Sequence, residues 1–430
     1  MKDMNRRGFI GAVSMLGCSL GAGGLWAAPD KAVKTPRTVG GTWSGWQPGH
    51  FQLHSIYTGV CESMFLIYPD GTSMLLDCGD HPAINRGAFA VPVLPNGGRH
   101  AGEWIARYVK RVNPFADKVD YLVLSHFHSD HSGIGNWSAG AFREGRHEYA
   151  LSGFAQAAQW LKFKKAVDRG WPNYNDPLPL TTFEEQASAE IMRRLYAHLA
   201  ERDGLVLEKF SLGAKDQFAQ CKGRIGGFSV LNICGNGRIV QPDGSVRDVY
   251  RSRIERDHVK TLNENGLSLG LLFSYGRFSL LTTGDLSDCW QEPDGQWHHT
   301  EDDLADAVPR VSVAKINHHG HHSTTTRLAA ALRPRVWFSN VWDQLHDTAD
   351  TMERIFGAYP GEKAVYAGIM PAERRWEDIG KPWTGIVAKE SNRGIHVVFD
   401  VPPGGETFEV FCLSAEDEKM RIVGQERYES

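Results

Sequence analysis

A turn with three histidines and an aspartate directly follows an apolar segment, and this arrangement most constrains how the chain can fold. Residues 119–124 (VDYLVL) are rich in branched and aromatic side chains and predict a short buried strand. The next residues read Ser-His-Phe-His-Ser-Asp-His, from Ser125 to His131. Imidazole and carboxylate groups in this pattern are ligands for zinc or a similar divalent cation. One turn cannot complete the coordination of two ions, so the ends of other strands must meet it.

The spacing within this turn predicts which side chains act together. His126 and His128 are two residues apart, and on an extended backbone they point the same way. Asp130 and His131 follow on the turn, where they can face a second ion. The alternative is a histidine-rich surface loop, which fits a lone His-x-His better than His-x-His-x-Asp-His.

A second apolar segment also ends in a candidate ligand. Residues 278–285 (FSLLTTGD) predict a strand that runs into a Gly-Asp turn, with Asp285 at its end. Its carboxylate can bridge two cations, because each oxygen can take one. The alternative is a turn aspartate that bonds its own backbone.

A third strand end carries a second histidine cluster. Residues 311–323 read VSVAKINHHGHHS, and seven of the chain's 18 histidines fall in this segment and in the first turn. Gly320 allows the backbone to turn sharply. We expect His319 to be the metal ligand and His318 to lean toward substrate, with His321 and His322 at the loop surface.

These motifs resemble those of the metallo-β-lactamase superfamily, whose hallmark is His-x-His-x-Asp-His with later Asp and His ligands. A closer likeness is to the external hydrolase domain of bacterial DNA-uptake channel proteins and to phosphorylcholine esterases. The likeness covers roughly residues 51–412. Its first parts are an opening Gly-acid-Ser turn (57–63), a hairpin (65–71) and a Leu-Leu-Asp-x-Gly strand (74–79). An Asn-rich approach (263–273) and a Lys-x-x-His-His-Gly motif (315–320) follow. The last parts are a helix (328–332), a strand (336–340) and a loop histidine, His346.

The resemblance implies an α/β (α+β) fold, a four-layer αββα sandwich with a helical insertion. It also implies two divalent metal ions, zinc in the first place, with manganese or iron as alternatives. The implied ligands are His126, His128, Asp130, His131, Asp285 and His319. Asp77 is expected to orient a ligand histidine rather than to bind metal.

The chain departs from the family pattern at three points. Cys61 stands where a glycine is usual, and His321 stands where a serine is usual. A further histidine ligand, common between the first motif and the Gly-Asp turn, has no clear counterpart. His147, His198 and His258 lie in that interval, and the sequence assigns none of them. The first metal is therefore under-ligated or completed by water.

The resemblance implies a hydrolase in which a metal-bound hydroxide attacks a phosphoester or phosphodiester. Asp130 would hold an ion and orient the hydroxide, while His318 and His346 would donate to the substrate or its leaving group. An acyl hydrolase acting on a lactone or β-lactam remains open, because the same ligands serve both reactions. A non-catalytic binding protein is the third alternative, and the complete ligand set counts against it.

The N-terminal segment predicts export. Residues 5–10 (NRRGFI) form a twin-arginine signal, and the 21 residues from Gly8 to Ala28 are uncharged. We divide the chain into a signal peptide at 1–28, an N-terminal arm at 29–50, a hydrolase domain at 51–413 and a polar tail at 414–430. Within the domain, residues 153–210 are expected to be a helical insertion.

Two helices are expected in this insertion, at residues 154–168 and 183–202. Trp171 and Tyr174 lie between them. They are candidate substrate contacts, or they pack the insertion's own core.

Charge and compartment limit the partners. The formal net charge is −4, and loss of the two signal arginines would make the mature chain more negative, which counts against strong binding of nucleic acids. We expect a periplasmic or secreted protein whose partners are the twin-arginine export machinery and a small-molecule or phosphoester substrate. Only the signal segment would meet the membrane, with an uncleaved anchor or a lipoprotein-like site at Cys18 as alternatives. A disulfide between Cys61 and Cys78 is open, but folding before export favours free thiols.

Overall fold

The computed structural model describes residues 37–81, 91, 93–133, 141–144, 146–343, 345–370, 380–383 and 393–430. The twin-arginine segment and the first part of the N-terminal arm lie outside these ranges. Within the described part of the chain, no helix has the length and apolar character needed to cross a membrane.

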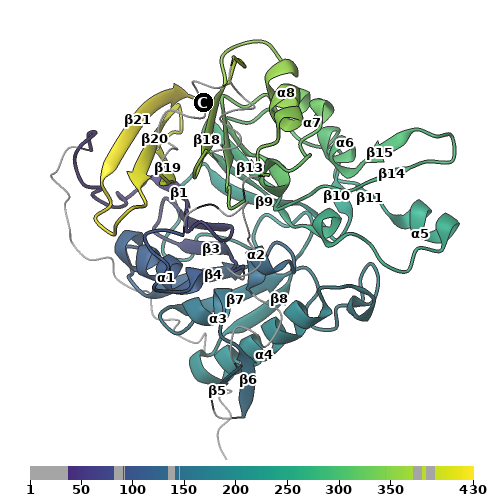
Figure 1. Ribbon diagram of the computed structural model, residues 1–430, viewed down its shortest axis with the longest axis horizontal. Coiled ribbons are helices and arrows are strands. Elements are labelled where there is room, and N and C mark those ends of the chain that lie inside the picture. The colour runs from purple at the N-terminus through teal and green to yellow at the C-terminus, as the bar shows by residue number, and fades with distance from the viewer. Residues whose placement is uncertain are drawn as a thin grey trace, which may run out of the picture.

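Two large mixed sheets form the centre of the molecule (Figure 1). The first has nine strands in the order β21-β20-β19-β1-β2-β3-β4-β7-β8. Their bounds are, in chain order, β1 Phe51–Ser55, β2 Ser63–Ile67, β3 Ser73–Cys78, β4 Lys118–Val123, β7 Lys162–Asp168, β8 Val206–Lys209, β19 Ile395–Val401, β20 Thr407–Ser414 and β21 Ile422–Glu429.

The second sheet has eight strands in the order β11-β10-β9-β12-β13-β16-β17-β18. Their bounds are β9 Phe228–Gly235, β10 Arg238–Val240, β11 Val246–Asp248, β12 Gly270–Tyr275, β13 Phe278–Thr282, β16 Val313–Lys315, β17 Val336–Ser339 and β18 Ala364–Ala367. Two small hairpins stand apart from the sheets, β5 Ala141–Glu144 with β6 His147–Ala150, and β14 Cys289–Gln291 with β15 Trp297–His299.

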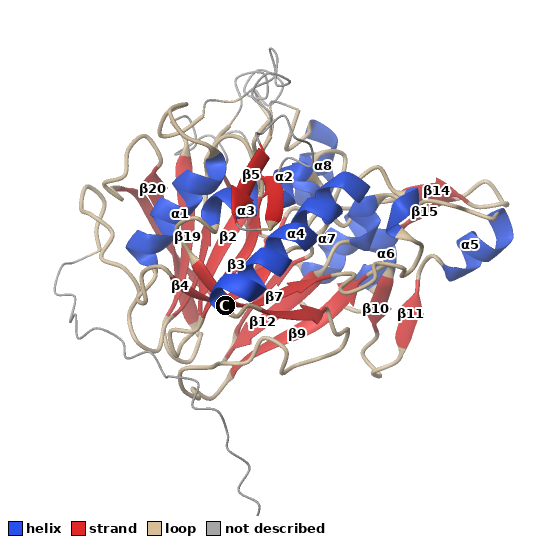
Figure 2. Ribbon diagram, turned by 90° about the horizontal axis from the view of Figure 1, so that it is seen from below, coloured by secondary structure: helices blue, strands red, loops and turns tan. Residues whose placement is uncertain are grey.

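Helices cover the outer faces of both sheets (Figures 1 and 2). On the side of the first sheet lie α1 Ala101–Val112, α2 Ser129–Ser132, α3 Gly153–Ala157 and α4 Gln186–Asp203. On the side of the second lie α6 Thr300–Ala305, α7 Thr326–Leu332 and α8 Ala349–Gly357, while α5 Arg251–Asp257 projects beyond the sandwich.

The core explains this layering. One apolar cluster fills the space between the two sheets, with Phe51 from the first sheet and Phe273 from the second in stacked contact at 5.7 Å. Another packs the helices on the sheets' outer faces, for example Ile105 of α1 and Leu195 of α4. Strands buried on both faces, such as β19, read as almost continuous apolar runs because neither face meets water. The expected four-layer αββα sandwich is confirmed.

Parallel pairing brings the candidate ligands to one edge. In the first sheet β3 pairs in parallel with β4. In the second sheet β16 pairs in parallel with β13 on one side and with β17 on the other. The carboxyl ends of parallel neighbours lie at the same edge of a sheet. The turns after β4, β13, β16 and β17 therefore meet where the two sheets adjoin. The start of β2 joins them, because β2 is antiparallel to β3.

Two expectations about the secondary structure are wrong. The segment 154–168 is not one helix, because only 153–157 are helical and 162–168 form β7 in the first sheet. Lys162 and Lys164 are exposed on either side of buried Phe163, so the first part of the segment has the two-residue period of a strand. The helical part of the predicted insertion is thus the connection between β7 and β8, residues 169–205, which we call the crossover segment.

The polar tail is the second correction. Residues 422–429 pair along β20 as the edge strand β21, and they bury Ile422 and Gly424. The segment is polar because this edge strand is largely exposed, but its pairing with β20 makes it part of the first sheet and not a tail.

Candidate metal centre

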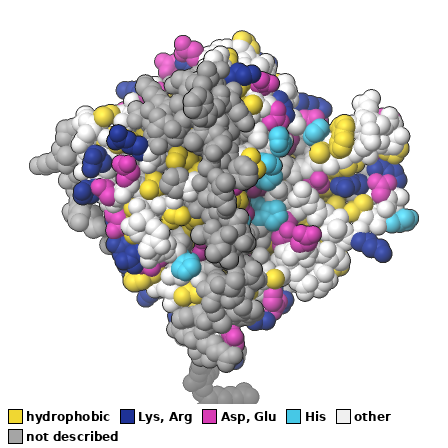
Figure 3. All heavy atoms as spheres, viewed as in Figure 1, with side chains coloured by type: hydrophobic (Ala, Val, Ile, Leu, Met, Phe, Trp, Pro, Cys, Tyr) yellow, Lys and Arg dark blue, Asp and Glu magenta, His cyan; other side chains and the backbone are white. Residues whose placement is uncertain are grey.

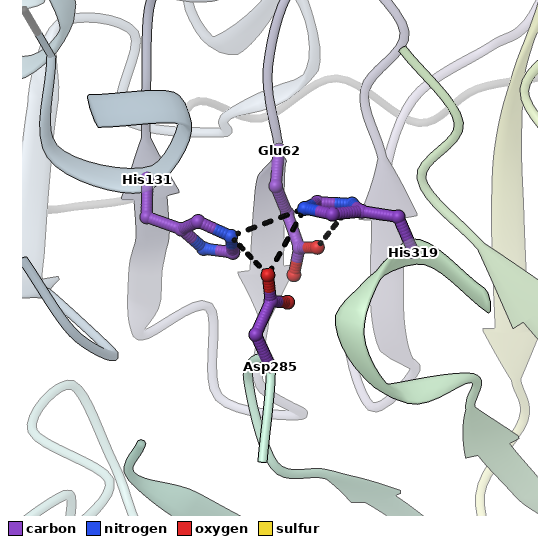
Figure 4. Close-up of side chains that lie close together, drawn as sticks. All are labelled: Glu62, His131, Asp285 and His319. Atoms are coloured by element: carbon purple, nitrogen blue, oxygen red, sulfur yellow. Dashed lines mark hydrogen bonds and ion pairs between the residues drawn. The ribbon is translucent and has the colours of Figure 1, made fainter. Parts of the chain in front are cut away.

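Four buried side chains converge at the edge where the strand ends meet: Glu62, His131, Asp285 and His319 (Figure 4). One ligand atom from each lies within 4.8 Å of those of the other three. Oδ2 of Asp285 is 3.1 Å from Nε2 of His131 and 3.1 Å from Nε2 of His319. The two imidazole nitrogens are 3.3 Å apart. Among the described residues this is the group of potential ligands that could hold a metal ion.

Backbone contacts hold the turns that supply these residues. The N–H of Glu62 donates to the carbonyl oxygen of Asp130 at 2.9 Å, which ties the start of β2 to the histidine turn after β4. A Cβ on Gly79, just after β3, would lie 1.8 Å from that same carbonyl oxygen, so only glycine allows the end of β3 to lie this close to the histidine turn. At the third turn, Gly320 has a φ of +74°, in agreement with the sharp turn expected there.

The ring of each ligand histidine is also fixed from its outer side. Nδ1 of His131 is 2.8 Å from Oδ2 of Asp77, and Nδ1 of His319 is 2.8 Å from the carbonyl oxygen of Asn340. In both rings Nε2 therefore faces the centre of the cluster. A carboxylate or carbonyl behind a ligand imidazole sets its tautomer and orientation in metal sites. The contact of Asp77 with His131 agrees with the orienting role expected of it.

The charges of the cluster call for a cation. Burial lowers the pKa of His131, but the carboxylates of Asp285, Asp130 and Asp77 raise it well above its usual range. Burial raises the pKa of Asp285, but His131, His319 and Lys315 hold it well below its usual range. A buried carboxylate therefore stays charged only where a positive group lies beside it. A divalent ion would supply that positive charge, and both imidazoles can bind it in their neutral form.

The donor set fits such an ion. Two imidazoles and two carboxylates are a suitable ligand set for zinc, manganese or iron. Oε1 of Glu62 is buried and has no hydrogen-bond partner among the described residues. A buried carboxylate oxygen without a donor is costly unless a ligand takes that position. Glu62, His131, Asp285 and His319 would therefore hold the metal.

Lys315 sets which carboxylate oxygens remain for the metal. Its buried ammonium lies 2.9 Å from Oε2 of Glu62 and 3.3 Å from Oδ1 of Asp285, and it donates to the carbonyl oxygen of Gly284 at 2.7 Å. Oδ1 of Asp285 is therefore occupied, and only Oδ2 faces the histidines. The bridging role expected of Asp285 stays a prediction.

The remaining predicted ligands lie beside the four-residue cluster. Oδ2 of Asp130 is 3.0 Å from Nε2 of His319 and 3.7 Å from Nε2 of His131, and it also accepts from the indole N–H of Trp342 at 3.1 Å. Nε2 of His126 is 3.1 Å from Nδ1 of His128, and both side chains adjoin the cluster without belonging to it.

The other predicted site residues border the same region. His346 is buried and stacks on His319 at 4.8 Å, and its Nδ1 accepts from two backbone N–H groups, so its proton is on Nε2. Nδ1 of His318 is 3.3 Å from Oγ of Ser287, and burial lowers its pKa to about 4. His318 is only partly buried. Figure 3 shows that several histidine side chains of the molecule are exposed on one face. The expected surface position of His322 is confirmed.

The crossover segment settles the roles of two aromatic residues. Tyr174 is 2% exposed, and its hydroxyl donates to Oδ2 of Asp168 at 2.6 Å. Trp171 packs edge-on against Tyr196. Both side chains pack the core of the segment, so the reading as substrate contacts finds no support in their positions.

None of the three unassigned histidines joins the cluster. Nε2 of His147 is 2.6 Å from Glu201, and the ring of His198 lies 5.4 Å from that of His147. His258 is exposed at the end of α5. Each of the six described cysteines is a free thiol, including Cys61 and Cys78.

Three residues at this site were not predicted: Glu62, Lys315 and Trp342. Glu62 and Lys315 belong to the opening turn and the Lys-x-x-His-His-Gly motif, so the motifs contain them without showing their role. No local pattern singles out Trp342, because only the fold brings the loop after β17 to the histidine turn.

Comparison with known proteins supports the resemblance in part of the chain. Residues 58–200 match the family model of the metallo-beta-lactamase superfamily. This range includes Glu62, Asp77 and the histidine turn, whereas Asp285 and His319 lie beyond it. A search of curated proteins finds no match to the chain. The narrower likeness to DNA-uptake proteins and phosphorylcholine esterases has no support from these comparisons.

Proposed function

We propose that this protein is a metal-dependent hydrolase that acts on a phosphoester or phosphodiester. The observation that carries the proposal is the buried convergence of Glu62, His131, Asp285 and His319 at the edge of the sandwich. The match of residues 58–200 to a superfamily that generally comprises hydrolases adds support.

A divalent ion held by these four residues would lower the pKa of a bound water and polarise the oxygen under attack. The chain's own groups prepare the site for this chemistry. Asp77 and the carbonyl of Asn340 fix the two imidazoles, and Lys315 holds the two carboxylates in place. Because these partners are buried, the ligands need little rearrangement when the ion binds.

Hydrogen-bond donors beside the cluster favour a phosphoryl substrate over a lactam. Nδ2 of Asn340 is buried without a hydrogen-bond partner among the described residues, so this donor is available beside the cluster. His318 is partly exposed and can donate to a phosphoryl oxygen, and Nε2–H of His346 can donate to the leaving group. A phosphoryl group offers several acceptor oxygens, whereas a lactam site is better served by an apolar floor.

We further propose that the mature protein works in the periplasm or outside the cell after export by the twin-arginine route. The twin-arginine motif at residues 5–10 supports this location. Free buried cysteines agree with folding before export, because a chain that folds in a reducing compartment keeps its thiols reduced.

The test is hydrolysis of a chromogenic phosphodiester by the zinc- or manganese-loaded protein. We expect turnover by the wild type and a loss of at least about 100-fold in Asp285→Ala, because a metal ligand is removed. Asp294→Ala, at an exposed turn of the β14–β15 hairpin, is the matched control and should keep full activity. A metal-loaded protein that hydrolyses a lactone or β-lactam but no phosphodiester would overturn the substrate assignment.

A further inference from the structure

A carboxylate of the crossover segment contacts the histidine turn from outside the four-residue cluster. Oε1 of Glu185, at the start of α4, is 3.1 Å from Nε2 of His128. The side chains are 16% and 30% exposed, so the contact is largely shielded from water. It joins residues 57 positions apart in the chain, so only the fold brings them together.

The two nitrogens of the His128 ring serve opposite sides. Nε2 faces Glu185, whereas Nδ1 lies 3.1 Å from Nε2 of His126. Nδ1 of His126 in turn is 3.0 Å from Oγ of Ser125. The two rings therefore turn one nitrogen each toward a common point and bind a protein oxygen with the other. The same division holds for His131 and His319 in the four-residue cluster.

We propose that Glu185 is a positioning residue that orients His128 for a second, more weakly held divalent ion between His126 and His128. This inference rests on the proposed metal-dependent function. Glu185 cannot bind that ion together with Nδ1 of His128, because it contacts the opposite side of the ring. Its role is to accept the Nε2 proton and so keep Nδ1 free as a ligand.

The number of ligands explains why the second ion is held more weakly. Four side chains of the described residues can surround the first ion, and no third histidine, cysteine or carboxylate of the described chain forms such a group with His126 and His128. Two imidazoles leave half of a tetrahedral shell to water or substrate. The first site thus has more side-chain ligands than the second, and the second ion should exchange more easily.

One buried ion pair fixes both partners of the Glu185–His128 contact. Arg169 and Glu264 are fully buried and joined by two hydrogen bonds of 2.7 Å. Glu264 also accepts from the backbone N–H of Phe127, which stands between His126 and His128. The guanidinium of Arg169 lies 5.4 Å from the ring of Phe183, two residues before Glu185. The histidine turn and the start of α4 are therefore held by the same pair.

The test is a titration of the metal-free, full-length protein with Zn²⁺ and with Co²⁺, followed by calorimetry and by the Co²⁺ absorption spectrum. We expect two binding events of unequal affinity in the wild type. Glu185→Gln keeps the shape of the side chain but loses its charge, and it should weaken the second event about 10–100-fold and leave the first unchanged. Glu184→Gln, an exposed neighbour, is the matched control and should change neither event.

His128→Ala should abolish the second event alone, and its circular dichroism spectrum reports whether the variant folds. Equal affinities in Glu185→Gln and wild type, or equal weakening of both events, would overturn the assignment of Glu185. If the protein binds two ions as expected but hydrolyses no substrate, the result contradicts the proposed function and leaves the role of Glu185 intact. A wild type that binds no ion would remove both.

Discussion

The buried pair of Arg169 and Glu264 yields a stability prediction whose size follows from the structure. Both side chains are fully buried and make two charge-assisted hydrogen bonds of 2.7 Å. Replacing Glu264 by Gln leaves the guanidinium buried without an opposing charge. Breaking a buried pair in this way costs about 3–5 kcal/mol, because desolvation of the remaining charge is no longer offset.

We expect Glu264→Gln to lose about 3 kcal/mol of unfolding free energy. The value is at the lower end of that range because the amide oxygen can still accept one hydrogen bond. A loss of this size raises the ratio of unfolded to folded protein by about 100-fold. Urea unfolding followed by tryptophan fluorescence measures it as a shift of the midpoint.

Two comparison variants separate the buried charge from other effects. Glu255→Gln removes the partner of Arg251 in an exposed i,i+4 pair and should cost under about 0.5 kcal/mol. The double variant Arg169→Met with Glu264→Leu leaves no buried charge, so it should be less destabilised than Glu264→Leu alone. If Glu264→Gln costs under about 1 kcal/mol, or the double variant is the least stable, the reasoning from charge burial is refuted.

Three further predictions concern the metal cluster, the crossover segment and pH. Glu62→Gln should weaken the first metal-binding event at least about 10-fold, since a ligand carboxylate is lost; calorimetry measures this, and unchanged affinity would exclude Glu62 as a ligand. Tyr174→Phe should cost about 1–3 kcal/mol in urea unfolding, because buried Asp168 loses a donor, and a change in substrate affinity without loss of stability would contradict its packing role. Burial raises the pKa of Glu301 to about 7 from its usual 4.5, so its stabilising effect is complete below about pH 4.5 and lost as pH rises through about 7. The difference in unfolding free energy between wild type and Glu301→Gln should therefore fall over that window and stay level above it. A difference that rises over the window would contradict a raised pKa of Glu301.

The sequence predicts the part of the site that lies in strand-end turns. His131, Asp285 and His319 each follow a short apolar segment, so local pattern and parallel pairing place them together. Glu62 was not predicted as a ligand, because an acid in a Gly-rich turn before a strand looks like ordinary turn chemistry. Its contact with Lys315 depends on how the two sheets meet, which no local window contains.

The sandwich itself is predictable from the motifs, but some of its strands, such as β7 and β21, are not. β7 contains three lysines, and a charged segment of this length is typical of an exposed helix. The strand forms because Lys162 and Lys164 point outward on alternate positions while β4 pairs with the backbone. Tertiary pairing overrides local preference here, as it does for the edge strand β21.

The most direct test of the central claim joins metal content with activity in one preparation. The purified full-length protein is stripped with a chelator, assayed on a chromogenic phosphodiester, and assayed again after Zn²⁺ or Mn²⁺ is added, with metal content measured by mass spectrometry at each stage. Turnover should disappear with the metal and return with it, and it should not return in His319→Ala. Full turnover by the metal-free protein would contradict a metal-dependent hydrolase at this cluster.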